Sequence, residues 1–219
     1  MGCDSTRDSV TARDIWRDTI YRVCITVTVA PARASLAQMT STILALLLSL
    51  PPFANEPIPE PPAARFERLT TQAEAVWLAS ASRPPGVSRG QWVGALLALG
   101  WLESRFARYV GVDRCLDGPP DARCDPDEVT GIPRAKGHFQ AHRAACPQLW
   151  TLPGGSVEWH RYAARCASGR LTGAYLRCRA RAPSPLAGAF AGYRGADCEW
   201  GPSGRRARTA LAFAARLGA

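Results

Sequence analysis

A run of apolar residues from position 88 to position 106 constrains the fold of this chain more than any other segment. Trp92, Leu96 and Leu99 recur at the spacing of one stripe on an α-helix. Glu103 continues this stripe by one turn and is the one charged residue between the arginines near the two ends of the run. A helix that is apolar nearly all round lies inside a protein core. The sequence therefore predicts a buried helix with a carboxyl at its C-terminal end.

The position of Glu103 has two interpretations. Glutamate is rarely buried without a partner, and burial favours the neutral carboxyl because the charged form loses its hydration. A carboxyl that stays protonated near neutral pH can act as the general acid in the cleavage of a glycosidic bond. In the other interpretation, Glu103 lies at a frayed helix end and is exposed to water. The run alone leaves both interpretations open.

Two further motifs follow Glu103. The three motifs are ESRF, which begins at Glu103, GHFQ at 137–140 and AGYRG at 191–195. Together and in this order they resemble the soluble lytic transglycosylase family, whose typical motifs are E-S-x-F, G-x-G-L-M/F-Q and A-Y-N-x-G. The resemblance extends from about Gln91 to the C-terminus. It implies a mainly α, lysozyme-like fold, similar to goose-type lysozyme, in which a short β-ribbon often follows the catalytic helix. The gap from Glu103 to Gln140 is longer than usual in this family and holds Cys115 and Cys124, so we expect an inserted loop there that a disulfide ties.

The resemblance also assigns roles to individual residues. Glu103 matches the family's sole catalytic acid/base. The residues expected to contact substrate are Ser104, His138, Phe139, Gln140 and Tyr193. Two positions depart from the family's pattern, because His138 replaces the usual leucine and Arg194 replaces the usual asparagine.

The activity implied by the resemblance is cleavage of peptidoglycan between N-acetylmuramic acid and N-acetylglucosamine. Glu103 would protonate the leaving oxygen and then accept the proton of the C6 hydroxyl, which closes a 1,6-anhydro ring. The substrate's N-acetyl group would take the part of a second carboxylate. Three alternatives stay open: a goose-type-like hydrolytic muramidase, a catalytically inactive glycan-binding domain of the cell wall, and a basic interaction protein unrelated to glycans.

The N-terminal part of the chain predicts a processed segment. Residues 43–50 are apolar but too few to cross a bilayer, and a proline-rich stretch follows them. We therefore expect a signal peptide region over 1–54, with Met39 as an alternative start, a linker over 55–62 and one domain over 63–219. We also expect the protein to be exported to the periplasm or the medium and to contact the membrane only through the signal peptide.

Six of the eight cysteines follow the apolar segment. An even number in an exported domain predicts disulfides, although six cysteines allow many connectivities. The most local pairing joins Cys115 to Cys124, Cys166 to Cys178 and Cys146 to Cys198.

Composition narrows the partners. The chain carries 27 basic and 18 acidic residues, a formal charge of +9, which suits a polyanionic partner such as a cell-wall polymer. No basic block alternates with aromatic residues, so nucleic acid is not expected. The cysteine and histidine spacings match no metal motif, and we expect a monomer without metal or cofactor.

Helical spacing and turn residues outline the domain. They predict helices over 63–82, 88–106, 156–166, 171–181, 183–192 and 203–217. Residues 107–136 hold glycine, proline and two cysteines with little periodicity, and they predict a loop-rich insertion.

Overall fold

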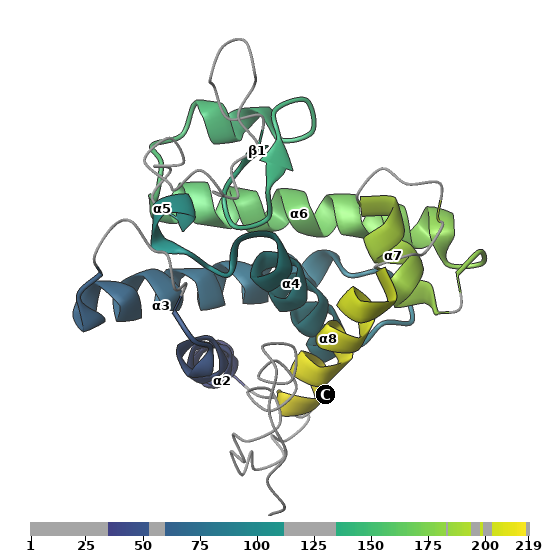
Figure 1. The fold of residues 1–219 in the computed structure, drawn as a ribbon, viewed down its shortest axis with the longest axis horizontal. Coiled ribbons are helices and arrows are strands. Elements are labelled where there is room, and N and C mark those ends of the chain that lie inside the picture. The colour runs from purple at the N-terminus through teal and green to yellow at the C-terminus, as the bar shows by residue number, and fades with distance from the viewer. Residues whose placement is uncertain are drawn as a thin grey trace, which may run out of the picture.

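The computed structural model describes residues 35–52, 60–111, 135–182, 184–193, 198 and 203–217. Within these residues the protein is mainly helical and has one two-stranded sheet (Figure 1). The α-helices are α2 (Leu36–Ser49), α3 (Pro62–Ala79), α4 (Arg89–Ser104), α5 (Arg108–Gly111), α6 (Val157–Cys178), α7 (Pro185–Tyr193) and α8 (Ser203–Arg216). The strands are β1 (Ala135–Lys136) and β2 (Ala141–His142), and the short 3₁₀ helices are η1 (Ser80–Ser82) and η3 (Pro147–Trp150).

The predicted buried helix is confirmed as α4, which lies at the centre of the fold (Figure 1). Ser88 begins it, because its hydroxyl accepts a hydrogen bond from the Gln91 amide and the Gln91 side chain accepts one from Ser88. The helix packs closely on α8, where a Cβ atom added at Gly94 would lie 2.5 Å from the carbonyl oxygen of Ala210. Arg105, in a left-handed conformation at a φ of 55°, ends it.

Helix α6 corrects the prediction of two helices separated at Ser168 and Gly169. It runs unbroken for 22 residues, although a glycine inside a helix costs about 1 kcal/mol relative to alanine. Ser168 is buried, and its hydroxyl donates to the Ala79 carbonyl oxygen at 3.0 Å. The same hydroxyl accepts a hydrogen bond from the Trp92 indole at 2.9 Å. These contacts with α3 and α4 hold the helix together where local composition predicts a break.

The structure has a short β-ribbon after α4, but it spans residues 135–142 and overlaps the predicted insertion over 107–136 only in its first strand. Strands β1 and β2 pair in antiparallel register, with Ala135 opposite His142 and Lys136 opposite Ala141. The GHFQ motif forms the turn between them. Gly137 and Gln140 both have positive φ angles, 72° and 48°, and the Gln140 amide donates to the Gly137 carbonyl oxygen at 2.9 Å. At the start of the predicted loop-rich insertion the structure has a short helix, α5, and residues 112–134 of the insertion lie outside the described residues.

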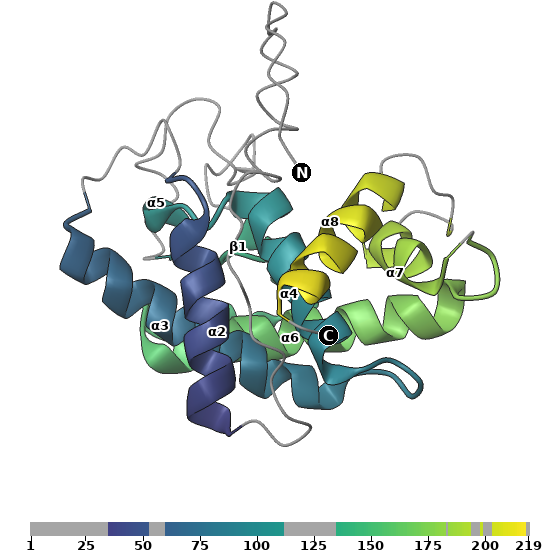
Figure 2. The same ribbon diagram turned by 90° about the horizontal axis from the view of Figure 1, so that it is seen from below.

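The apolar segment assigned to a signal peptide forms the C-terminal part of α2, which crosses α3 (Figure 2). Ile43, Leu46 and Leu47 are buried in the same core as α3 and α4. The Arg65 guanidinium also donates to the Leu50 carbonyl oxygen at 2.9 Å. No helix within the described residues is long and apolar enough to cross a membrane. Removal of residues 1–54 stays a prediction, and it would take α2 out of this core.

Two disulfides confirm that the domain is cross-linked, but their connectivity differs from the local pairing. Cys146 pairs with Cys166 and Cys178 pairs with Cys198, with Cα atoms 6.0 and 5.2 Å apart. The predicted bonds between Cys166 and Cys178 and between Cys146 and Cys198 are therefore wrong. Cys166 and Cys178 both lie on the unbroken α6, about 18 Å apart along its axis, which no disulfide can span. The predicted pair of Cys115 with Cys124 lies outside the described residues.

Candidate functional site

The three sequence motifs meet beside the C-terminal end of α4. The Ser104 hydroxyl lies 3.1 Å from Nδ1 of His138, which is 34 positions further along the chain. The Tyr193 hydroxyl donates to the carbonyl oxygen of Phe139, 54 positions earlier, at 2.9 Å. One residue of the GHFQ turn thus contacts the ESRF motif, and its neighbour contacts the AGYRG motif.

Glu103 lies in the last turn of α4 and forms an ion pair with Arg206 of α8. Its side chain is 20% exposed and that of Arg206 is 12% exposed, so water reaches both groups only in part. A part-buried carboxylate is held best by a charge-assisted hydrogen bond, which the guanidinium supplies. Glu103 is thus one member of an ion pair, neither the unpartnered acid nor the fully exposed glutamate of the two sequence interpretations.

Ser104 points into the core and closes the end of α4. Its buried hydroxyl donates to the Gly100 carbonyl oxygen at 3.0 Å and accepts from the Phe106 amide at 3.2 Å. The Phe106 ring lies so close to Gly100 that a Cβ atom there would come within 2.5 Å of it. The ESRF motif therefore forms the turn that ends α4, where Arg105 and Phe106 both have positive φ angles.

His138 is also buried, and its ring stacks on the ring of His160 with centroids 6.0 Å apart. Burial lowers the pKa of both imidazoles, and the charge of Arg68 lowers both further. For His160 the pKa falls to about 4. The Nε2 atom of His138 has no hydrogen-bond partner within the part of the chain that the structure describes. Both imidazoles are neutral at neutral pH.

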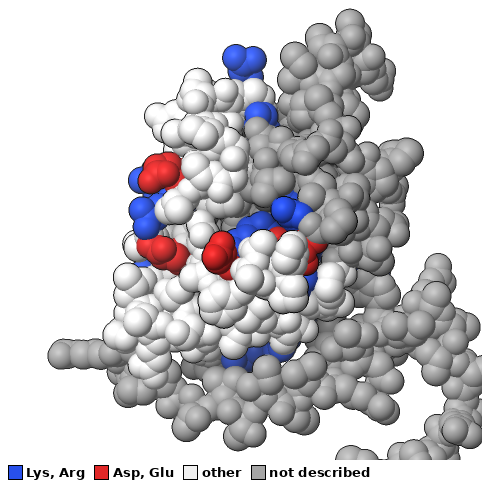
Figure 3. Space-filling view, turned by 90° about the vertical axis from the view of Figure 1, so that its left-hand side faces the viewer, with Lys and Arg blue, Asp and Glu red and all other residues white. Residues whose placement is uncertain are grey.

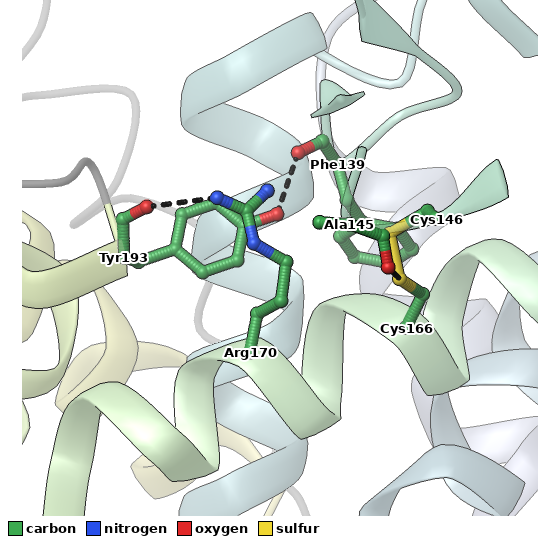
Figure 4. The surroundings of a disulfide bond; sticks show 6 residues. All are labelled: Phe139, Ala145, Cys146, Cys166, Arg170 and Tyr193. Carbon is green, nitrogen blue, oxygen red and sulfur yellow. Dashed lines mark hydrogen bonds between the residues drawn. A yellow bond between two sulfur atoms is a disulfide. The ribbon is translucent and has the colours of Figure 1, made fainter. Parts of the chain in front are cut away.

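Tyr193 is buried beneath Arg170, whose guanidinium carbon lies 4.7 Å from the phenol ring centre (Figure 4). Burial raises the pKa of the Tyr193 phenol far above its usual value, and the charge of Arg170 opposes that rise. The charges of Glu103 and Arg206 act on the same phenol, so the ion pair and Tyr193 share one neighbourhood. Tyr193 is therefore a neutral hydrogen-bond donor that supports the Phe139 turn.

Gln140 is half-buried at the end of this turn. Its side-chain amide donates to the Gly137 carbonyl oxygen at 3.1 Å, which holds the side chain against its own turn. Phe139 is buried beside it. Of the six predicted site residues, Glu103 and Gln140 are partly exposed, whereas the others are buried and support them. Catalysis by Glu103 and substrate contact by the other five stay predictions.

Sequence reasoning missed three residues of this neighbourhood: Arg206, Arg170 and His160. Each comes from a helix whose register against α3 or α4 is set by packing over long sequence separations. The arginine-rich composition of 203–217 was the one signal that pointed to Arg206. No group of three or more metal-binding side chains lies together within the described residues.

Comparisons with protein-family models, with curated proteins and with solved structures found no match for this chain.

Proposed function

We propose that this protein is a peptidoglycan lytic transglycosylase with Glu103 as its acid/base. The observation that carries the proposal is the convergence of the three motifs. Ser104 contacts His138, and Phe139 accepts a hydrogen bond from Tyr193, beside the helix end that bears Glu103. A part-exposed carboxyl at the end of a buried helix, next to a short β-hairpin and a buried tyrosine, is the arrangement that the family resemblance implies.

In the proposed reaction, Glu103 protonates the oxygen that links N-acetylmuramic acid to N-acetylglucosamine. The N-acetyl group of the substrate attacks the anomeric carbon as that bond breaks. The C6 hydroxyl then displaces the N-acetyl oxygen and loses its proton to Glu103, which forms the 1,6-anhydro product. Gln140 would contact the sugar, and Tyr193 would hold the turn that carries Gln140 in place.

The ion pair adds a requirement to this mechanism. Arg206 engages the Glu103 carboxylate, so substrate binding has to separate the two groups, and Glu103 has to take up a proton from water before it can protonate the leaving oxygen. The same ion pair favours a second candidate function, a glycan-binding domain of the cell wall without turnover. In that case Glu103 and Arg206 would hold α4 and α8 together permanently.

The deciding experiment is incubation of the purified protein with peptidoglycan sacculi, followed by mass analysis of the soluble products. We expect products that end in 1,6-anhydromuramic acid, whereas hydrolytic products would assign the protein to the muramidases. Acid/base catalysis by a positioned group contributes about 10²–10⁴-fold, so Glu103→Gln should lower product release by at least that range.

The matched control is Glu74→Gln, which removes another ion-paired glutamate, the partner of Arg161, from the surface of α3 and α6. It should release products at the wild-type rate. Wild-type activity in Glu103→Gln would refute the catalytic role. Binding to sacculi without products from the wild type would favour the glycan-binding domain.

We also propose that the protein acts outside the cytoplasm. Disulfides persist in oxidising compartments, and the Cys146–Cys166 and Cys178–Cys198 pairs suit such a location. The proposed substrate lies there too.

A further inference from the structure

The ion pair of Glu103 and Arg206 is oriented against the dipoles of both its helices. Glu103 lies in the last turn of α4, and Arg206 lies in the first turn of α8. A helix dipole disfavours a carboxylate at the C-terminal end of a helix and a cation at the N-terminal end. The reverse placement of the two charges would stabilise both helix ends, so the stability of α4 and α8 does not explain this orientation.

Each member of the pair depends on the other for its counter-charge. Both side chains are mostly buried, and within the described residues Glu103 is the one carboxylate that pairs with Arg206. On the face that Figure 3 shows, by contrast, acidic and basic side chains lie beside one another at the surface, where water screens their charges. A mostly buried guanidinium that loses its carboxylate is costly, because neither water nor another anion replaces the partner.

The proposed acid/base cycle removes this counter-charge. Glu103 takes up a proton before it protonates the leaving oxygen, and its carboxyl is then neutral. The described charged groups that act on the Tyr193 phenol are Arg170, Arg206 and Glu103. When Glu103 is neutral, two guanidinium groups and no carboxylate are left among them. The protonated site therefore attracts an anion.

We propose that Arg206 exchanges the Glu103 carboxylate for a carboxylate of the substrate and so selects N-acetylmuramic acid units. These units carry a carboxylate on the lactyl group or on the peptide attached to it, whereas N-acetylglucosamine carries none. A guanidinium group holds a carboxylate by paired, charge-assisted hydrogen bonds. The exchange keeps Arg206 paired while it frees the carboxyl of Glu103. The inference rests on the proposed function, which brings the glycan to Glu103, and it uses no residue of the segment 1–54.

The test is calorimetric titration of Glu103→Gln, which the proposed function makes inactive. The three probes are soluble glycan strands without peptides, the same strands with their lactyl carboxyls amidated, and strands that keep their peptides. We expect one of the two anionic probes to bind at least about tenfold more tightly than the amidated strands, since amidation removes a charge-assisted hydrogen bond. Preference for the peptide-free strands assigns the carboxylate to the lactyl group, and preference for the other anionic probe assigns it to the peptide. Equal binding of all three probes would overturn the proposal.

A second substitution assigns this preference to Arg206. On the Glu103→Gln background, Arg206→Gln should abolish the preference, and it leaves no carboxylate without a partner. The matched control Arg205→Gln removes an exposed charge from the neighbouring position of α8 and should keep the preference. A preference that persists in Arg206→Gln, or that Arg205→Gln lowers equally, would be a general charge effect and would refute the role of Arg206.

The wild type gives a comparison that does not depend on the folding of Arg206→Gln. Titrated before products accumulate, it should bind the preferred strands more weakly than Glu103→Gln, because its carboxylate competes for Arg206. Equal or tighter binding by the wild type would contradict the exchange.

The outcome is separable from that of the proposed function. Products with 1,6-anhydro ends but without a preference for anionic strands would refute only the exchange. A preference that depends on Arg206, without products from the wild type, would refute only the catalysis and would leave Arg206 as the anion contact of a glycan-binding domain.

Discussion

The buried histidine pair predicts a protein that loses stability in mild acid. His160 lies in the core, where its ring stacks on His138 and packs edge-on against Trp159. Gln72 contacts its Nδ1 atom. A charged imidazolium at this position would lack water and would face the positive charge of Arg68, so the folded protein holds the neutral ring.

The size of the effect follows from the lowered pKa. Burial and Arg68 lower the pKa of His160 from 6.5 to about 4. The unfolded chain therefore binds a proton at His160 over a pH range in which the folded chain does not, and the free energy of unfolding falls as the pH falls through that range. From about pH 7 to about pH 5, His160 alone should account for a loss of about 2 kcal/mol. His138, whose pKa is also lowered, adds a loss of the same sign.

The assay is urea unfolding at these two pH values with the disulfides intact. The variant His160→Gln should show a loss between the two pH values that is smaller than the wild-type loss by about 2 kcal/mol, whatever its stability at pH 7. His142 is exposed, and His142→Gln is the matched control that should keep the full loss. An undiminished pH dependence in His160→Gln would show that the acid sensitivity has another source and would refute this reasoning.

Two further predictions concern packing and processing. Gly94→Ala should lower the free energy of unfolding by about 1–3 kcal/mol, because its Cβ atom would overlap the backbone of α8. The control Gly169→Ala, on an open face of α6, should instead raise that free energy by about 0.5–1 kcal/mol. Thermal unfolding measures both changes, and the same effect in the two variants would argue against a tight contact between Gly94 and α8. Sequencing the N-terminus of exported protein should show a chain that begins after residue 54. A chain that still contains Cys24 would contradict the predicted processing, and one that begins between residues 25 and 36 would keep α2 in the core.

Local patterns were sufficient to predict helices α3, α4, α7 and α8. Helix α4 has a capping serine, an apolar periodicity and a glutamate at its end, and each of these signals lies within one or two turns. The boundaries of α3, α7 and α8 were also close to the predicted ones, for the same reason. The predicted break in α6 was wrong, since the contacts that override Gly169 come from Ala79 and Trp92, far away in the sequence.

The partners of the candidate site depended on tertiary packing. The motif order predicted that Glu103, the GHFQ turn and Tyr193 belong together, but it did not predict the ion pair of Glu103 with Arg206. That contact is decided by how α8 lies against Gly94 on α4, a close approach that no periodicity encodes. The disulfides show the same limit, because cysteine spacing is a distance along the chain, whereas a bond depends on a distance in space. Helix-forming patterns act between residues that are close in the sequence, so the sequence alone predicts them. The charges and cysteines that pair across the core come together only when the helices pack.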